Sequence, residues 1–308
     1  MARYLVTGGC GFIGSHLTER LLALGHEALV LDNLSTGKRD NLPAGVRLIE
    51  GDVADQPLVD AALAGTDGCF HLAAVASVQK SNEDWLGTHR ANLTGTIAVL
   101  DGARRHGRLP VVYASSAAVY GDNPDLPLAE TAQLRPLSAY GADKMGSELH
   151  ARVASLVHGV PTTGFRFFNV FGPRQDPHSP YSGVISIFIN RLLAGQPVTI
   201  FGDGLQSRDF IYVSDIVDHL VAAMTKPEAE ARVFNACTGR ATTLLDLVGV
   251  LGTLIGITPD IHFAAPRAGD IRFSLGNPAL AVARLGVSAR TSLSNGLAAT
   301  LPSAPKAP

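Results

Sequence analysis

The chain has 308 residues, of which 46% are hydrophobic and 17% are charged, which is typical of a compact folded protein and excludes a disordered one. The formal net charge is -2 and the basic residues form no long run, so we expect no nucleic-acid partner. No long apolar segment precedes the first strand pattern, so we expect neither a signal peptide nor a membrane span, and a cytoplasmic location.

Short apolar runs alternate with segments of helical length through most of the chain. This alternation predicts an α/β fold, namely a Rossmann-type, doubly wound parallel sheet with helices on both faces. The expected strands are 3–7, 27–31, 46–50, 68–72, 110–114, 163–168 and 233–236. The expected helices between them are 15–23, 56–63, 92–105, 143–157 and 214–224.

Beyond residue 168 the alternation becomes irregular. Segment 172–181 contains three prolines and is predicted to be a long loop, as is 206–210, while 243–255 and 278–285 have helical patterns. We therefore expect a cofactor-binding domain at 1–168, with a returning segment at about 210–238, and a smaller interleaved substrate lobe at 169–209 and 239–300. The proline-rich residues 301–308 are predicted to be a flexible tail.

A glycine-rich turn joins the first strand to the first helix. Residues 7–14 read Thr-Gly-Gly-Cys-Gly-Phe-Ile-Gly. In this setting glycines let a pyrophosphate approach backbone N–H groups at the start of a helix. The expected contacts in this turn are Gly8, Gly11, Phe12, Ile13 and Gly14.

The ends of the second and third strands carry carboxylates. Asp32, followed by Asn33, can accept hydrogen bonds from adenosine ribose hydroxyls and would repel a 2′-phosphate, which favours NAD over NADP. Lys38 and Arg39 lie near enough to bind such a phosphate, so the preference is a prediction. Asp52 can meet the adenine, or it can be a solvated loop carboxylate.

Tyr140 and Lys144 are four residues apart in a predicted helix, so both side chains lie on one face. An adjacent cation favours the phenolate and brings the tyrosine pKa towards neutral pH. We expect Tyr140 to accept a hydroxyl proton while a hydride leaves the same carbon. An exposed helix face with no chemical role is the alternative.

The three cysteines, Cys10, Cys69 and Cys237, are isolated, which predicts reduced packing residues. Four histidines also lack partner residues at metal-ligand spacing in the sequence, namely His16, His71, His150 and His158. We therefore expect no metal site.

With these motifs in place, the chain resembles the extended short-chain dehydrogenase/reductases over about residues 3–300 and, within them, the NAD-dependent UDP-hexose 4-epimerases. The most similar group is the UDP-N-acetylglucosamine 4-epimerases. The resemblance implies reversible epimerisation at C4 of a UDP-hexose through a 4-keto intermediate and transient NADH. It assigns Ser116 as the catalytic serine beside Tyr140 and Lys144. It adds cofactor contacts at Asp52, Val53, Leu72, Ala73, Ala74 and Asn92.

The two positions after Ser116 separate neighbouring reactions. In the 4,6-dehydratases and UDP-glucuronate decarboxylases of this superfamily, the resemblance implies acidic residues there, whereas this sequence has Ala117 and Ala118. Alanine cannot transfer a proton, so oxidation followed by re-reduction is favoured. Ketose reductases of the group usually prefer NADP, which Asp32 opposes.

The resemblance also predicts how the nucleotide is bound. Arg208 and Arg267 match arginines that bind the diphosphate, and guanidinium groups suit phosphate oxygens. Read singly, each arginine would more often be a solvated ion pair. The other expected contacts are Asn169 at the diphosphate, Asp270 at the ribose, and Val184, Ile185, Thr199 and Phe201 at the uracil.

Small residues stand where epimerases restricted to glucose and galactose have larger ones. Ser274 replaces a tyrosine, Gly183 an asparagine and Ala76 a lysine, and Ser77 follows in the same site. Gln175 resembles a residue of epimerases that prefer acetylated sugars. The extra volume favours UDP-GlcNAc and UDP-GalNAc, with UDP-Glc and UDP-Gal also accepted. Alternatively, Ser274 is small for packing and both sugar classes react equally.

Two other functions stay open. A UDP-glucuronate 4-epimerase, or another NAD-dependent enzyme acting on nucleotide sugars, would need a cation for the C6 carboxylate. A non-catalytic NAD sensor is disfavoured by the intact Ser116, Tyr140 and Lys144. Helices 92–105 and 143–157 match those that form a four-helix interface in the family, so we expect a homodimer.

Overall fold

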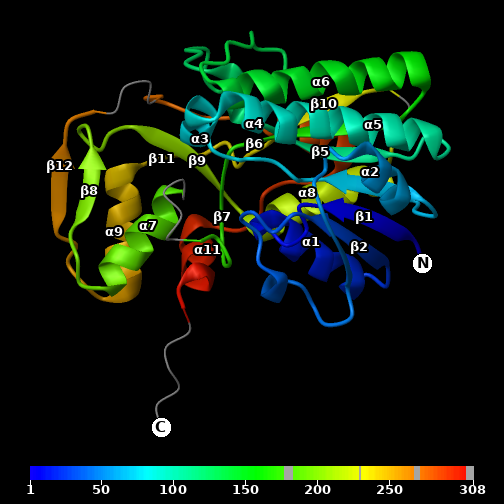
Figure 1. Ribbon diagram of the computed structural model, residues 1–308. Coiled ribbons are helices and arrows are strands. Elements are labelled where there is room, and N and C mark those ends of the chain that lie inside the picture. The colour runs from blue at the N-terminus through cyan, green and yellow to red at the C-terminus, as the bar shows by residue number, and fades with distance from the viewer. Residues whose placement is uncertain (177–182, 229, 267–270, 303–308) are drawn as a thin grey trace.

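The computed structural model describes residues 1–176, 183–228, 230–266 and 271–302 (Figure 1). At its centre is a parallel sheet with the strand order β10-β6-β5-β4-β1-β2-β3, which confirms the predicted Rossmann-type α/β fold. All the expected strands lie in this sheet. They are β1 (Arg3–Thr7), β2 (Glu27–Asp32), β3 (Arg47–Glu50), β4 (Gly68–His71), β5 (Val111–Ser116), β6 (Thr162–Phe167) and β10 (Arg232–Ala236).

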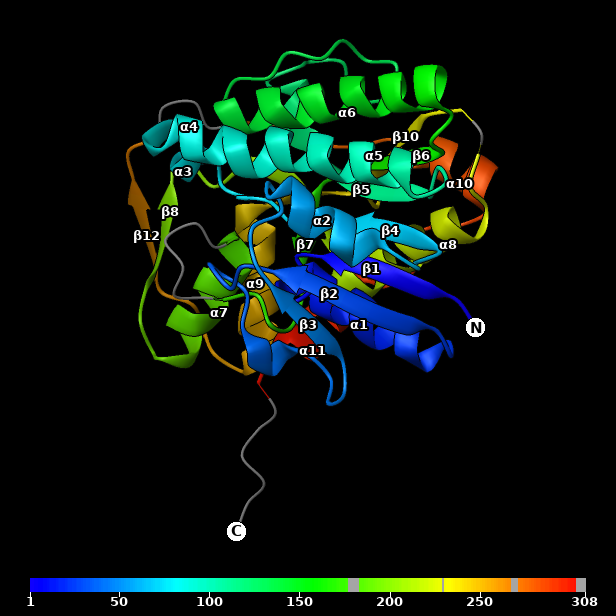
Figure 2. The ribbon, with the colours of Figure 1, turned by 45° about the vertical axis from the view of Figure 1, so that its right-hand side comes forward.

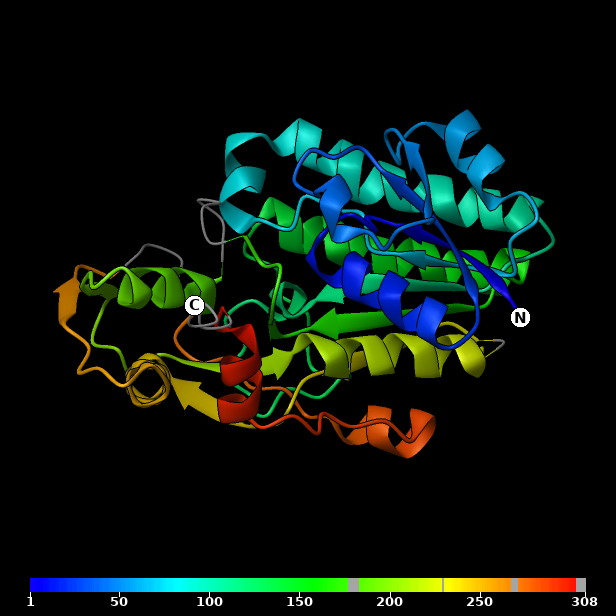
Figure 3. The same ribbon diagram turned by 90° about the horizontal axis from the view of Figure 1, so that it is seen from below.

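Helices cover both faces of the sheet. One face carries α2 (Gln56–Leu63), α5 (Gly95–Arg105) and α6 (Ala139–His158) (Figure 2). The other carries α1 (Phe12–Ala23), α8 (Val213–Thr225) and α10 (Ala279–Leu285), which lie side by side when seen from below (Figure 3).

Side chains that alternate along each strand supply the two cores. In β1, Leu5 packs with the α2, α5 and α6 side, and Val6 with the α1 and α8 side; both are fully buried. In β4, Cys69 and Phe70 divide in the same way. Burial on both faces explains why these strands are continuous apolar runs in the sequence.

The sheet reverses its winding beside β1. β2 and β3 continue on one side of β1, whereas β4 and β5 lie on the other, so the ends of β1 and β4 border a crevice. Gly8, directly after β1, has φ +71°, and a Cβ there would lie 2.7 Å from the backbone nitrogen of Ala73. Only glycine permits this close approach of the two strand ends.

The helix that carries Tyr140 is longer than predicted. α6 begins at Ala139, where Ser138 caps it by accepting a hydrogen bond from the Gly141 N–H at 3.1 Å. Tyr140 is therefore in its first turn. The expected helix 92–105 is instead a π-helical segment, Arg90–Thr94, followed by α5. Other short helical segments are α3 (Val78–Glu83), α4 (Trp85–His89), and the 3-10 turns Arg39–Asn41 and Ala117–Tyr120.

The remaining elements form a smaller lobe beside the sheet (Figure 1). Its core contains Phe188, Leu247, Leu251 and Leu297. The lobe consists of β7 (Asn169–Phe171), β9 (Ser207–Tyr212) and β11 (Ala241–Thr243) in one sheet, β8 (Val198–Phe201) and β12 (Ile261–Ala264) in another, and α7 (Val184–Leu193), α9 (Leu244–Ile255) and α11 (Leu293–Thr300).

The predicted loop at 206–210 is wrong, because residues 207–212 form β9 between β7 and β11. The strand was not predicted because its first three residues, 207–209, are polar. Asp209 is fully buried there, and its carboxylate accepts hydrogen bonds from Thr238 N–H, Thr238 Oγ1 and Gly239 N–H at 2.8, 2.6 and 2.9 Å. A buried carboxylate satisfied in this way is compatible with a central strand.

All three cysteines are buried and reduced, which confirms their packing role. Among the residues described, we find no helix of sufficient length and apolar character to cross a membrane. Within the same residues, no group of three or more His, Cys, Asp or Glu side chains could hold a metal ion. The tail prediction at 301–308 falls mainly on residues 303–308, which lie outside the described part.

Candidate active site

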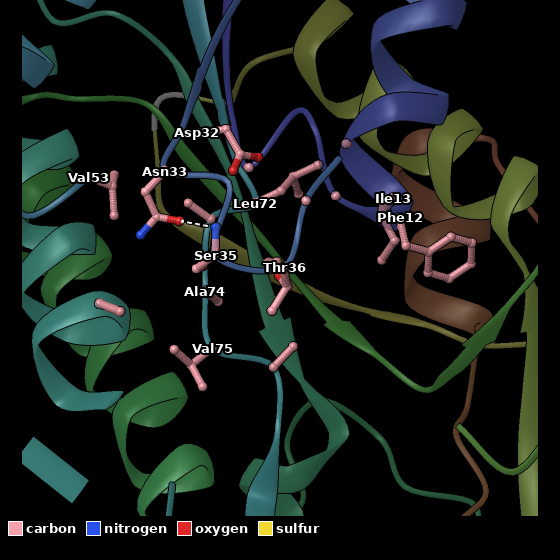
Figure 4. Close-up of a pocket in the computed structure, with 18 of the residues that line it drawn as sticks. Phe12, Ile13, Asp32, Asn33, Ser35, Thr36, Val53, Leu72, Ala74 and Val75 are labelled. Carbon is pink, nitrogen blue, oxygen red and sulfur yellow. Dashed lines mark hydrogen bonds between the residues drawn. The ribbon is translucent and has the colours of Figure 1, made fainter. Parts of the chain in front are cut away.

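A cavity runs along the carboxyl ends of β1, β2 and β4 (Figure 4). It contains nearly all of the cofactor contacts predicted from the sequence. Those lining it are Gly8, Gly11, Phe12, Ile13, Gly14, Asp32, Asn33, Asp52, Val53, Leu72, Ala73, Ala74, Tyr140 and Lys144.

The phosphate end of this cavity is the start of α1. Gly11 precedes the helix, and no side chain caps the first N–H groups of α1. A Cβ on Gly14 would overlap the carbonyl group of Gly8, so the turn requires glycine there. An uncapped helix N-terminus that borders a cavity suits a pyrophosphate, by hydrogen bonding and by the helix dipole.

The adenosine end of the cavity has a buried carboxylate. Asp32 accepts hydrogen bonds from the N–H groups of Cys10 and Leu34, both at 2.9 Å, which fixes its orientation. Lys38 lies 3.5 Å from Asp176, and Arg39 lies 2.8 Å from Glu50. Both nearby cations therefore face carboxylates, which makes a 2′-phosphate a poor fit and NAD a good one.

Asn92 does not line this cavity. Its side chain accepts a hydrogen bond from Val75 N–H at 2.8 Å and donates to Val75 O at 3.2 Å. It holds the loop after β4 that borders this cavity. Other residues that line this cavity were missed by the sequence analysis. Three of them lie in the loop that follows Asp32, namely Ser35, Thr36 and Gly37. The rule that loops after strand ends bind cofactors could have identified them. The others are Leu31, Gly51, Val75, Ala91, Ala114, Ser115 and Phe167.

The three expected catalytic residues lie together. Ser116 ends β5, and its hydroxyl forms a hydrogen bond with that of Tyr140. Lys144 is 3% exposed, donates from Nζ to Ala114 O at 2.7 Å, and lies 5.9 Å from the centroid of the Tyr140 ring. Ser81 Oγ accepts from the backbone N–H of Tyr140 at 3.1 Å.

The pKa values of this cluster depend first on desolvation. Burial raises the pKa of Tyr140, and the hydrogen bond with Ser116 opposes this effect. Burial lowers the pKa of Lys144 to about 8, against the influence of Asp143. The expectation that Lys144 brings the pKa of Tyr140 towards neutral pH is therefore wrong for the protein by itself, since desolvation of the phenol raises this pKa.

A second cavity adjoins the first. Tyr140 and Phe167 line both, so the phenol stands where the two spaces meet. Four residues predicted to contact substrate border the second cavity, namely Ser116, Asn169, Arg208 and Ser274. Its other lining residues were not predicted as contacts; they are Val78, Gln79, Asn82, Ala117, Ala118, Gly121, Leu137, Ser138, Phe168 and Ile271. None of these described lining residues is a carboxylate.

The other predicted sugar contacts are not among the described residues that line the second cavity. Ala76 lines the first cavity, and Ser77 caps α3 by accepting from Lys80 N–H at 3.0 Å. Gln175 donates to Val170 O at 3.5 Å, and a Cβ on Gly183 would lie 3.0 Å from Gln175 Nε2.

The predicted uracil contacts lie in the smaller lobe. Val184 begins α7, and Ile185 is buried in the core of the lobe. Thr199 and Phe201 are on β8, where Phe201 borders a third cavity with Phe263. Arg267 and Asp270 lie outside the described residues.

The fold and these two joined cavities are those of a nucleotide-cofactor enzyme. The profile of the NAD dependent epimerase/dehydratase family matches residues 4–237, and the chain belongs to that family. It is an NAD-dependent enzyme, and its cofactor is NAD.

Known relatives extend the likeness to almost the whole chain. A UDP-glucose 4-epimerase of Mycolicibacterium smegmatis is 37% identical, with 97% of each chain covered. Two solved structures cover 97% of both chains with a TM-score of 0.93. One is a UDP-glucose 4-epimerase from Thermotoga maritima with UDP-glucose, 36% identical. The other is a UDP-N-acetylglucosamine 4-epimerase from Methanobrevibacter ruminantium in complex with UDP-N-acetylmuramic acid, 33% identical.

The lowered pKa of Lys144 predicts a pH-dependent stability. The folded pKa of about 8 lies below the ordinary 10.5, so between these values the unfolded chain binds more protons and stability rises with pH. Lys144→Met should reduce this rise by up to about 1.4 kcal/mol per pH unit. Urea unfolding at several pH values measures it, with the exposed Lys226→Met as control. Parallel curves for Lys144→Met and wild type would contradict the prediction.

Proposed function

We propose that the protein interconverts UDP-hexoses that differ at C4, with a preference for UDP-GlcNAc and UDP-GalNAc and with UDP-Glc and UDP-Gal also accepted. The observation that carries this proposal is the position of Tyr140 in the walls of both cavities. A proton acceptor at this position can contact both a cofactor in the first cavity and a second ligand in the second cavity. The likeness to enzymes named as UDP-glucose and UDP-N-acetylglucosamine 4-epimerases supports the substrate class.

The roles of the three polar residues follow from their contacts. Tyr140 takes the O4 proton and later returns it, while the Ser116 hydroxyl shares a hydrogen bond with that phenol. The buried ammonium of Lys144 is held by Ala114 O, close enough to the ring for its charge to favour the phenolate. NAD supplies the group that accepts and returns the hydride, together with a positive charge that acts in the same direction.

The lining of the second cavity favours epimerisation over elimination. Ala117 and Ala118 occupy the positions after Ser116, and no carboxylate borders the cavity among the described residues. Among the described lining residues, none besides Tyr140 is suited to remove a proton from C5. Arg208 is the one cation in this described lining, and we assign it to the diphosphate, which disfavours a glucuronate substrate.

The proposed sugar preference depends on small side chains. Ser274 borders the second cavity, as do Ala117, Ala118 and Gly121, so the wall offers room for an N-acetyl group. In Gln175 we propose an amide that hydrogen-bonds this group, since the hydrogen bond that its Nε2 donates to Val170 O, within the described residues, is long at 3.5 Å.

We also propose that each lobe binds a different ligand. The sheet domain, 1–168 with the returning segment at about 210–238, binds NAD, and 169–209 with 239–300 binds the UDP group. Within the second range, α10 packs against β10 and α8 and so covers the sheet. We propose the expected contacts Asn169, Arg208, Arg267 and Asp270 for the diphosphate and ribose, and Thr199 and Phe201 for the uracil. Buried, reduced cysteines fit our proposed cytoplasmic location.

A homodimer is proposed from an exposed apolar stripe on α6. Leu149, Val153, Leu156 and Val157 are between 50% and 68% exposed, at the spacing of one helix face. Ile97 on the neighbouring α5 is also exposed. An apolar face of this kind on two adjacent helices suits pairing with its own copy in a four-helix arrangement.

Tyr140→Phe should lower kcat by about 10²- to 10⁴-fold, because it removes the proton acceptor. NAD binding should stay close to that of the wild type. The C4 isomers of UDP-GlcNAc and UDP-Glc are resolved chromatographically after incubation with each variant. Tyr4→Phe on β1, far from both cavities, is the matched control. A fully active Tyr140→Phe enzyme would remove Tyr140 from the chemistry.

Ser274→Tyr should narrow the sugar site. We expect kcat/KM for UDP-GlcNAc to fall at least about 10-fold, with a much smaller change for UDP-Glc, because the added ring fills the volume assigned to the acetyl group. Ser274→Ala is the control and should preserve both activities. Equal losses on the two sugars would contradict the proposed role of Ser274.

Leu156→Glu should convert the dimer to a monomer, since it places a charge in the apolar stripe. Light scattering coupled to gel filtration measures the mass. Leu280→Glu on α10, also at an exposed leucine, should not change it. A monomeric wild type, or an unaltered dimer of Leu156→Glu, would refute the interface.

A further inference from the structure

A buried ion pair lies behind the Tyr140–Lys144 pair and borders neither cavity. Glu148 and Arg166 are 8% and 5% exposed. Arg166 donates from Nε to Glu148 Oε1 at 2.9 Å and from its second guanidinium nitrogen to Oε2 at 2.7 Å. Two parallel bonds of this kind fix the relative orientation of both side chains.

The ion pair joins α6, the helix of Tyr140, to β6, and a hydrogen bond to Ser115 connects it to β5, the strand of Ser116. Ser115 Oγ donates to Glu148 Oε1 at 2.6 Å. Tyr140, Lys144 and Glu148 are four residues apart on one face of α6, and they contact Ser116, Ala114 and Ser115 of β5 respectively. Tyr140 and Lys144, which make the first two contacts, have assigned roles in catalysis. Glu148, which makes the third, has none.

Arg166 also secures the segment that follows Ser116. Its remaining nitrogen donates to Tyr120 Oη at 2.8 Å and to Glu130 O at 2.9 Å. Tyr120 ends the 3-10 turn that starts directly after Ser116, and its hydroxyl donates to Asn235 Oδ1 at 2.7 Å. One guanidinium therefore connects α6 to the turn on the far side of Ser116.

We propose that Glu148 and Arg166 are positioning residues that set the Ser116–Tyr140 geometry and thereby determine turnover without touching substrate or cofactor. The activity test of this role rests on the proposed epimerase function. A small displacement of reacting groups is costly, because a shift of about 1 Å can reduce a rate 10²-fold. The alternative is that the pair contributes only to folding stability.

Glu148→Gln keeps the shape of the side chain and an acceptor for Ser115 but removes the charge. We expect kcat to fall about 10- to 100-fold, with the KM for UDP-sugar and the Kd for NAD changed far less. Ser115→Ala should give a smaller fall in kcat, since it breaks the contact with β5 and leaves the ion pair intact. Leu63→Ala in the core under α2 is the control for lost stability, and should lower Tm without lowering kcat.

Glu148→Gln leaves a buried guanidinium without its charge partner and can impair folding. The double variant Glu148→Met/Arg166→Met avoids this, because apolar side chains of similar size often restore stability. We expect its Tm to approach that of the wild type while kcat stays low. A recovery of kcat together with Tm would overturn the positioning role.

The titration of Tyr140 tests the same role without any UDP-sugar. It is read as the near-ultraviolet difference between each protein and the same protein carrying Tyr140→Phe. The Ser116 hydrogen bond lowers the pKa of Tyr140, so loss of this geometry should move the midpoint to higher pH. Lys144 interacts electrostatically with Asp143 and His71, and all three residues are retained in every variant.

The two readouts separate the two proposals. A wild type inactive on all UDP-hexoses, with the expected shift in the Tyr140 titration, would refute the proposed function and support the positioning role. An unchanged midpoint or an unchanged kcat in a folded double variant would overturn the positioning role and leave the epimerase function standing.

Discussion

The site depends on the contact between one strand end and the first turn of one helix. β5 ends at Ser116, α6 begins at Ala139, and the hydrogen bond between Ser116 and Tyr140 joins them. Residues 117–138 separate β5 from α6 in the chain, so neither element can form the site by itself. The sheet fixes β5 through β4 and β6, and buried contacts of α6 fix the helix. The phenol thus stands at the boundary of two cavities because two packed elements meet there.

Desolvation and charge act against each other at this boundary. Burial makes both the phenolate and the ammonium costly, raising the pKa of Tyr140 and lowering that of Lys144 to about 8. Burial therefore keeps the Tyr140 phenol protonated at neutral pH. The protein instead contributes fixed geometry, with Lys144 held at 2.7 Å from Ala114 O. A positively charged ligand in the first cavity would then favour the phenolate only while it is bound, which couples proton removal to an occupied cofactor site.

How far the sequence predicts the structure differs between the two lobes. The strands of the central sheet are buried on both faces, so their apolar runs are visible in the sequence, and the glycine turn before α1 follows from the close approach at Gly8. β9 escaped prediction because it begins Ser207-Arg208-Asp209, and the partners that satisfy Asp209 are about thirty residues away. The role of Asn92 towards Val75 and the entry of Leu137 into the second cavity likewise depend on tertiary contacts that local patterns do not contain.

Inversion at C4 would require that the sugar present first one face and then the other to the group in the first cavity that takes and returns the hydride, and the lining of the second cavity suits this requirement. Ala117, Ala118 and Gly121 line part of this cavity, and their small side chains offer no polar contact that would hold a ring in one orientation. Asn169 and Arg208 stand in the same cavity and are suited to hold a diphosphate. Firm binding at the nucleotide and weak binding at the ring would let the sugar turn about its linkage without leaving. The same openness would suit the proposed acceptance of both acetylated and plain hexoses, since a site that admits a turning ring cannot fit one orientation tightly.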